Sequence, residues 1–184
     1  MRLEEPRLKP LADEELNEQA RQVLEGARMR GQIFNIFRTL AHHPKLLESW
    51  LVFGVQVLGK STLPPREREL VVLRMGWLCR SEYEWGQHVL IGRRAGLTDE
   101  EIHRIKEGAE AEGWNDLDRA MLRATDELRA DAFISNATWQ QLSEHLSTQQ
   151  LLDMIFVIGQ YNLVSMALNT LGVQRDEGVP GFDL

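Results

Sequence analysis

Apolar residues recur at helical spacing along most of the chain, and no segment shows the two-residue alternation of a strand. Prolines, glycines and capping residues separate the helical segments. Helices are predicted over residues 13–28, 33–41, 45–58, 62–78, 81–96, 98–108, 115–130, 135–145 and 147–172. The pattern predicts an all-α, single-domain helical bundle over residues 1–184, with its core at about 30–172 and an extended tail at 173–184.

Two four-residue signatures predict helix starts. Ser81-Glu82-Tyr83-Glu84 and Thr98-Asp99-Glu100-Glu101 both have the form of a capping box, in which the first side chain and the fourth bond each other's backbone N–H. The first signature begins the second arm of a helical hairpin whose first arm follows Pro64 and Pro65.

Composition excludes several classes of protein. The 184 residues are 43% hydrophobic and 27% charged, as in an ordinary globular domain. A net charge of −7, with basic residues scattered as in Arg66-Glu67-Arg68-Glu69, argues against a nucleic-acid partner, and we interpret that run as a solvated helix face. Polar residues interrupt the longest apolar stretch, residues 151–171, which argues against a membrane span. A single cysteine, Cys79, excludes an intrachain disulfide, and no secretory signal opens the sequence, so we expect a cytoplasmic protein.

The hairpin carries the chemistry of interest. Glu69 and His88 lie at similar distances from its turn, so antiparallel pairing can bring them together. Glu84 and His88, four residues apart, share a helix face, and Ser81 lies near that face. A histidine beside carboxylates suits proton transfer, because the carboxylates orient the ring and tune its pKa. Apolar walls from Tyr83 and Trp85, and from Trp77, could also raise a carboxylate's pKa.

Each of these residues has a purely structural alternative. Ser81 and Glu84 can simply cap the helix, and His88 can be an ordinary structural or exposed histidine. Trp85 can be a core aromatic, and Cys79 a buried, unreactive thiol. Spacing alone leaves these alternatives open.

A metal site is not expected. Glu69, Glu84 and His88 have the right atoms, but zinc would need further histidine or cysteine ligands, and di-iron sites use a different spacing with more glutamates. The adjacent His42 and His43 point about 100° apart on a helix, so they offer little help.

The hairpin sequence ELVVLRMGWLCRSEYEWGQHVLIGRRAG resembles the carboxymuconolactone decarboxylase family, which includes the alkyl hydroperoxidase D branch. The redox motif of that branch is Glu, eleven residues, Cys-x-x-Cys, three residues and His. Aligning His88 with the motif histidine places Glu69 on the motif glutamate without a gap. Further resemblance occurs in FRTLAHHP at residues 37–44, GQYN at 159–162 and LNTLGV at 168–173.

The departure from that motif defines the branch. Ser81 and Glu84 stand where the redox branch has its two cysteines, so the dithiol peroxidase mechanism is excluded. The resemblance thus implies the non-redox branch with an alkyl hydroperoxidase D-like fold. A peroxidase-like antioxidant protein that uses Cys79 with an external thiol remains an alternative.

The resemblance implies a cofactor-independent carboxy-lyase acting on a carboxymuconolactone-like or related small carboxylated molecule, as in aromatic catabolism. His88 would be the principal acid/base, Glu69 would orient it, and Glu84 would carry a second proton or contact the substrate. The expected substrate contacts are Tyr83, Trp85, Ser81, Tyr161 and Arg74, with Arg80 as a second cation. Isomerisation, hydration and retro-aldol chemistry would use the same acid/base groups.

Self-association is also expected. The helices that begin at Lys45 and Thr148 are apolar on more than one face, which exceeds what a chain of this size needs to bury. The resemblance implies a homodimer, trimer or hexamer, without choosing among them. A non-catalytic helical oligomer, in which the same polar residues are structural, is the alternative from a different functional class.

Overall fold

The computed structural model describes residues 2–28 and 31–183 of the 184-residue chain. Within these residues all regular secondary structure is helical, as predicted. The elements are η1 (Asp13–Glu15), α1 (Glu18–Gly26), α2 (Asn35–Leu40), α3 (Pro44–Gly59), α4 (Pro65–Leu78), α5 (Glu82–Ala95), α6 (Asp99–Glu107), α7 (Asp116–Asp131), α8 (Asn136–Ser143) and α9 (Thr148–Leu171).

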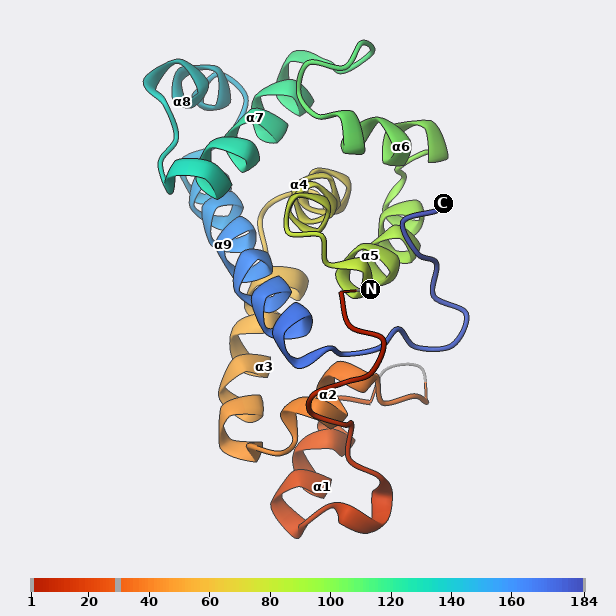
Figure 1. Cartoon of the computed structure of the whole chain (residues 1–184). Helices are drawn as coiled ribbons and strands as arrows, with labels where there is room; N and C mark the ends of the chain where they lie inside the picture. The colour runs from red at the N-terminus through yellow and green to blue at the C-terminus, as the bar shows by residue number, and fades with distance from the viewer. Residues whose placement is uncertain (1, 29–30, 184) are drawn as a thin grey trace.

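Helix α4 lies at the centre, with α5, α6, α7 and α9 packed around it (Figure 1). Every residue from Glu69 to Gly76 is buried, which is why α4 lacks a clear polar face. The main core is built on this helix, and α1, α2 and α3 enclose a smaller core of their own. Polar groups between Glu69 and Gly76 therefore need protein partners, since water does not reach them.

The predicted antiparallel hairpin is formed by α4 and α5. Cys79 ends α4, Arg80 turns the chain with a φ of +51°, and Ser81 precedes α5. The two arms meet at Gly76, where a Cβ would make an ordinary van der Waals contact of 3.5 Å with the backbone nitrogen of Trp85. This close pairing brings Glu69 and His88 to the same level of the hairpin.

The predicted single helix over residues 13–28 is wrong. Leu16 is extended, and Asn17 starts a new helix by accepting a hydrogen bond from the backbone N–H of Ala20, so η1 and α1 are separate. A side chain that caps a new helix competes with continuation of the preceding one. Here the capping hydrogen bond of Asn17 overrides the apolar periodicity that predicted a single helix. The other eight predicted helices are present, with their ends shifted by a few residues.

The C-terminal tail, residues 173–183, folds back over the hairpin. Asp176 accepts hydrogen bonds from Tyr83 Oη at 2.6 Å, Gln87 Nε2 at 2.8 Å and the backbone N–H of Asn35 at 2.9 Å. Farther on, the Phe182 ring packs edge-on against Trp77, with ring centroids 5.1 Å apart. The tail thus links α2 to α5 and covers one side of the hairpin.

Among the described residues, α9 is the one helix long and apolar enough to cross a membrane. Half of its apolar window is buried inside the protein, and core helices of water-soluble proteins pass the same test. Its buried face includes Gln160, Tyr161 and Ser165, which pack inward.

Gly86 provides a test of the tail's position. A Cβ at Gly86 would lie 2.2 Å from the carbonyl oxygen of Pro180, which is backbone and cannot rotate away. Gly86→Ala should therefore displace the tail and destabilise the protein by about 1–3 kcal/mol, measured by urea unfolding, with faster amide exchange over residues 176–183. Gly26→Ala, whose Cβ would meet nothing within 4 Å, is the matched control and should be neutral or stabilising. Equal stability of the two variants would contradict the packed tail.

Candidate active site

A chain of charged side chains crosses the hairpin from α4 to α5. His88 Nδ1 lies 2.5 Å from Glu69 Oε2, and His88 Nε2 lies 3.1 Å from Glu84 Oε1. The outer oxygen of Glu69 accepts a hydrogen bond of 2.9 Å from Arg68 Nε. The order Arg68, Glu69, His88, Glu84 alternates positive and negative groups, provided that the ring is protonated.

Both ring nitrogens of His88 face carboxylates, and this decides its protonation. An ionised carboxylate only accepts hydrogen bonds, so a ring between two of them needs a proton on each nitrogen. Burial opposes charge on the ring, but the attraction of Glu69 and hydrogen bonds to Glu69 and Glu84 outweigh it, raising the pKa of His88 to about 9. At neutral pH the ring is therefore an imidazolium.

Glu69 is the innermost member of the chain. Burial alone would raise its pKa, but the charge of His88, the hydrogen bond to that ring and the charge of Arg68 hold it below the ordinary value. Arg68 is in turn fixed by a 2.8 Å hydrogen bond from Nη1 to the carbonyl oxygen of Leu58. Arg68 was missed as a site residue, because it lies in the charge run that was interpreted as solvated.

That interpretation of residues 66–69 is wrong. Arg66 bonds both oxygens of Asp118 at 2.8 Å and also pairs with Glu101, while Arg68 and Glu69 bond each other. Neighbouring helices cover these side chains, so the run forms interhelical ion pairs instead of facing water. Nothing in the sequence around residues 66–69 predicts that other helices cover these side chains.

The exposed fractions order the network from inside to outside. Glu69 is 0% exposed, His88 4% and Glu84 5%. Glu84 is thus the carboxylate closest to solvent, and the proton between Glu84 Oε1 and His88 Nε2 is the one best placed for exchange with a bound molecule.

Tyr161 of α9 closes one side of the imidazolium. Its ring meets that of His88 edge-to-face, with centroids 4.7 Å apart. Burial and the negative charges of Glu84 and Glu69 raise the pKa of Tyr161 well above its ordinary value, so the phenol stays neutral. The predicted pocket donor is thus beside the network, brought there from a helix far away in sequence.

The capping-box prediction at the start of α5 is wrong, and this bears on Glu84. Ser81 precedes the helix but makes no capping hydrogen bond, whereas Thr98 and Glu101 form the predicted box at α6. The Glu84 carboxylate bonds His88 instead of the backbone. Ser81 Oγ is buried without a hydrogen-bond partner in residues 2–28 and 31–183. The structure therefore favours the site role of Glu84 over the structural one.

The other predicted substrate contacts lie in structural surroundings. Tyr83 bonds Asp176 of the tail, and Trp85 is fully buried, with Trp77 and Phe182 rings at 5.6 and 5.9 Å. Burial and the charge of Asp176 raise the pKa of Tyr83 above its ordinary value.

Arg74 is also engaged elsewhere. Its guanidinium bonds both oxygens of Asp126, at 2.7 and 3.0 Å, and the carbonyl oxygens of Ile105 and Lys106. It joins α4 to α6 and α7, while Arg80 is exposed in the hairpin turn. The structure therefore does not bring these two arginines to His88.

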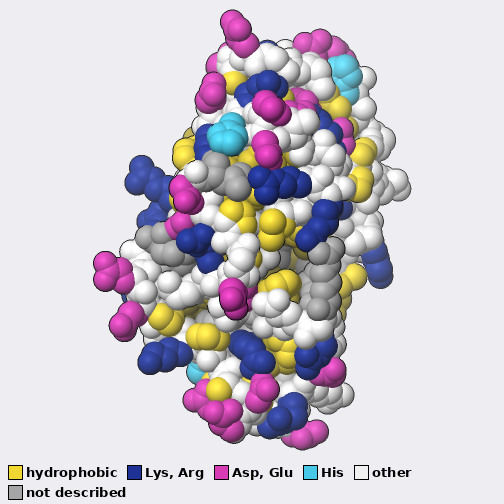
Figure 2. All heavy atoms as spheres, turned by 90° about the vertical axis from the view of Figure 1, so that its right-hand side faces the viewer, with side chains coloured by type: hydrophobic (Ala, Val, Ile, Leu, Met, Phe, Trp, Pro, Cys, Tyr) yellow, Lys and Arg dark blue, Asp and Glu magenta, His cyan; other side chains and the backbone are white. Residues whose placement is uncertain are grey.

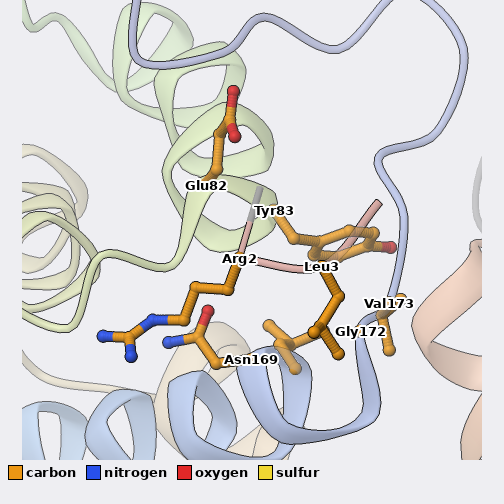
Figure 3. Close-up of a pocket in the computed structure, with 8 residues that line it drawn as sticks. Arg2, Leu3, Glu82, Tyr83, Asn169, Gly172 and Val173 are labelled. Atoms are coloured by element: carbon orange, nitrogen blue, oxygen red, sulfur yellow. The ribbon is translucent and has the colours of Figure 1, made fainter. Parts of the chain in front are cut away.

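A small hollow and an apolar groove lie apart from the network. Figure 3 shows the smaller one, about 10 Å³, where Arg2 and Leu3 lie between Tyr83 and the end of α9 near Asn169. It has room for about one water molecule. The larger, about 160 Å³, is an apolar groove between α2, α3 and α9. Neither is lined by His88, Glu69 or Glu84, so a substrate must reach the network through another opening or after movement of its cover.

Cys79 lies outside the network. Its side chain is buried, with Sγ 3.5 Å from Met75 Sδ and 3.4 Å from Asn162 Oδ1. Among the described residues, no group of three or more His, Cys, Asp and Glu side chains is arranged to hold a metal ion.

Residues 44–127 match the family model described as the carboxymuconolactone decarboxylase family. This segment runs from α3 into α7 and contains both arms of the hairpin. The resemblance inferred from the hairpin is thereby confirmed, and the lone Cys79 agrees with a branch that lacks the Cys-x-x-Cys pair. A comparison with curated proteins finds no match.

Solved structures share the fold at low sequence identity. An uncharacterised peroxidase-related protein from Silicibacter sp. TM1040 superposes with a TM-score of 0.81 at 17% identity, covering 96% of both chains. An alkylhydroperoxidase AhpD core protein from Ralstonia eutropha JMP134 gives 0.76 at 20% identity, covering 92% of this chain and 93% of that one. The debrominase Bmp8 gives 0.75 at 14% identity, covering 92% of each chain. The alkyl hydroperoxidase D-like fold is therefore confirmed.

Removing the charge of Glu69 tests the network. Glu69→Gln keeps the shape but leaves two buried cations, Arg68 and His88, without their shared anion, and should cost about 3–5 kcal/mol in urea unfolding at neutral pH. Glu67→Gln is the matched control on the same helix, because Glu67 is only loosely paired with Arg66, at 3.6 Å, and should cost less than about 1 kcal/mol. Similar losses in both variants would contradict the network.

The stability of the wild type should also depend on alkaline pH. The folded pKa of His88, about 9, lies above the ordinary value of 6.5, so the folded state binds this proton more tightly than the unfolded state. The resulting stabilisation is complete below pH 6.5 and is lost as the pH rises through about 9. Urea midpoints should fall across that interval, and a midpoint that stays constant or rises there would contradict the charged ring.

Proposed function

We propose that the protein is a cofactor-independent lyase that decarboxylates a small carboxylated molecule, of the carboxymuconolactone type or related to it. The buried imidazolium of His88 between Glu69 and Glu84 is the observation that supports this most strongly. It is a proton donor held in one orientation and largely removed from water. The match of residues 44–127 to the carboxymuconolactone decarboxylase family model also supports enzymatic chemistry.

The reaction needs one proton and no external electrons. The bond between the substrate carbon and its carboxylate breaks, carbon dioxide leaves, and the electron pair moves into the neighbouring conjugated carbonyl. The resulting enolate takes a proton at carbon from His88 Nε2, directly or through Glu84, and solvent restores that proton. Glu69, which is itself bonded by Arg68, keeps the ring charged and oriented.

The electrostatics of the site suit such a substrate. Arg68 and His88 carry two positive charges, and Glu69 and Glu84 carry two negative ones, so the network is neutral before a substrate binds. Transfer of a carboxylate from water into such a dry site favours decarboxylation, because neutral carbon dioxide leaves and the charge spreads over the conjugated enolate until it is protonated. Tyr161 can donate a hydrogen bond to the developing enolate oxygen, since its phenol stays protonated.

The peroxidase alternative has less support. The Cys79 thiol is buried and contacts Met75 and Asn162, while the acid/base chain lies elsewhere on the hairpin. Its role would require both exposure of the thiol and an external reductant.

A spectrophotometric decarboxylation assay on carboxymuconolactone tests the proposal. The His88→Ala variant should lose at least about a hundredfold in kcat, as expected for removal of a general acid. His103→Ala is the matched control, because His103 is exposed on α6, where its ring contacts the Asp99 carbonyl oxygen, and it should keep full activity. Full activity of His88→Ala would remove this residue from the mechanism.

The pH profile tests the role of His88 as an acid. Because the ring must carry its proton, kcat/KM should stay level near neutral pH and fall as the pH rises through about 9. A rate that increases over the same interval would show that a deprotonated group acts instead. Absence of any wild-type turnover would contradict this substrate and direct the assay to other carboxylated or hydroxylated small molecules.

A further inference from the structure

Two buried serines lie beside the charged network, Ser81 at the start of α5 and Ser165 in the middle of α9. We infer that their hydroxyl groups bind the carboxylate that the substrate loses and hold it next to Glu84 and His88. Ser165 is not among the substrate contacts predicted from the sequence. The inference rests on the proposed function and deepens it, by assigning the part of the site that recognises the leaving group.

Both hydroxyl groups are buried without a hydrogen bond. Ser81 and Ser165 are each 0% exposed, and neither Oγ has a hydrogen-bond partner anywhere in the described parts of the chain. A buried hydroxyl without a partner costs free energy, so such groups are rare in folded proteins. An acceptor that a bound molecule brings to this place would satisfy both.

Ser165 differs from three other hydroxyl residues inside helices. Ser49, Thr125 and Ser143 each donate a hydrogen bond to the carbonyl oxygen four residues earlier, at 3.0, 2.9 and 2.8 Å. This is a common local arrangement for serine and threonine in a helix. The Ser165 hydroxyl does not bond the corresponding carbonyl oxygen, that of Tyr161. It is therefore turned away from its own backbone and toward the packed interior.

The contacts of α9 fix the level at which Ser165 lies along the hairpin. Tyr161, one turn before Ser165, packs against the His88 ring with centroids 4.7 Å apart. Asn169, one turn after Ser165, donates a hydrogen bond of 2.8 Å to the carbonyl oxygen of Cys79, next to the hairpin turn. Residues four apart share a helix face, so Ser165 meets the hairpin between the levels of His88 and Cys79.

Ser81 and Glu84 occupy this same stretch of the hairpin. From the turn along α5 the order is Ser81, Glu84 and His88, each about one helical turn from the next. Two backbone hydrogen bonds of 2.9 Å fix Ser81, whose N–H donates to the carbonyl oxygen of Gly76 and whose carbonyl oxygen accepts from the N–H of Trp85. The two unpartnered hydroxyl groups thus come from neighbouring helices, on the same side of His88 as Glu84.

Neutral hydroxyl groups suit a carboxylate that has to leave. An arginine would bind it through charge-assisted hydrogen bonds, which are about twice as strong as neutral ones. That binding would be lost as carbon dioxide departs, so it would stabilise the ground state more than the transition state. Hydroxyl groups orient the carboxylate with less of this stabilisation, and repulsion from the negative charge of Glu84 further favours its departure.

The distribution of charged groups agrees with recognition by neutral donors. Arg74 is bound to both oxygens of Asp126, and Arg80 is exposed in the hairpin turn. On the face of the molecule that Figure 2 shows, acidic and basic side chains are spread over the surface instead of being gathered by sign. Placement of the substrate carboxylate therefore depends on donors inside the protein.

Ser165→Ala is the first test, in the decarboxylation assay on carboxymuconolactone. It should lower kcat/KM at least about tenfold, because a hydrogen bond to a charged group is lost. Inhibition by the decarboxylated lactone should change by less than about twofold, since that product lacks the carboxylate. Ser81→Ala should behave in the same way. The urea midpoints of both variants should match or exceed that of the wild type, because the free protein loses only unpartnered hydroxyl groups.

Thr39→Val is the matched control and should keep full activity. The buried hydroxyl of Thr39 is also unpartnered within residues 2–28 and 31–183, but it lies on α2, outside the hairpin. Wild-type kcat/KM in Ser165→Ala would overturn the inference, and so would an equal loss of affinity for the decarboxylated lactone or a lower urea midpoint. Full activity of Ser165→Ala beside an inactive His88→Ala would leave the proposed function standing.

Binding separates this inference from the proposed function should the wild type not turn the substrate over. A ligand raises the urea midpoint of the folded protein that it binds. A rise with carboxymuconolactone that Ser165→Ala abolishes would contradict the lyase function and support the carboxylate site. Absence of any rise in the wild type would overturn both.

Discussion

The contact between Glu69 and His88 determines which side chains of the hairpin are charged and how they are oriented. Helix α4 is covered on all sides, so the Glu69 carboxylate has no access to water and stays ionised only through His88 and Arg68. The charged ring must then place its second proton toward Glu84. One long-range contact therefore fixes the protonation of His88 and the orientation of Glu84, while burial and the two carboxylates keep Tyr161 neutral. The same arrangement joins the two arms of the hairpin and holds a proton between His88 and Glu84.

Much of this site could be predicted from the sequence, for a geometric reason. Equal spacing from a turn brings residues on two antiparallel helices together, and a separation of four places two residues on one face, so Glu69, Glu84 and His88 follow from counting. The role of Glu84 could not be settled in this way, because the signature of residues 81–84 also fits a capping box. The side chain has two competing partners, and only the folded hairpin shows that His88 is the one it bonds.

What escaped prediction depends on contacts between distant segments. From the sequence alone, the charged side chains of residues 66–69 are expected to face water. In the folded chain, α6, α7 and the hairpin supply their partners Glu101, Asp118 and His88. The sequence predicts an extended tail but not where it packs, because Asp176 acquires its three donors only when the tail folds back over α5. Tyr161 on α9 is a predicted substrate contact, but its edge-to-face contact with the His88 ring is shown only by the folded chain.

The most direct measurement of the central claim is the protonation state of the His88 ring, by nitrogen NMR of the protein with labelled histidine. We predict that both ring nitrogens carry a proton at neutral pH and that the ring titrates near pH 9. In Glu69→Gln the pKa should drop, because the ring loses the charge that attracts its proton. A neutral ring with a single protonated nitrogen at neutral pH in the wild type would contradict the account.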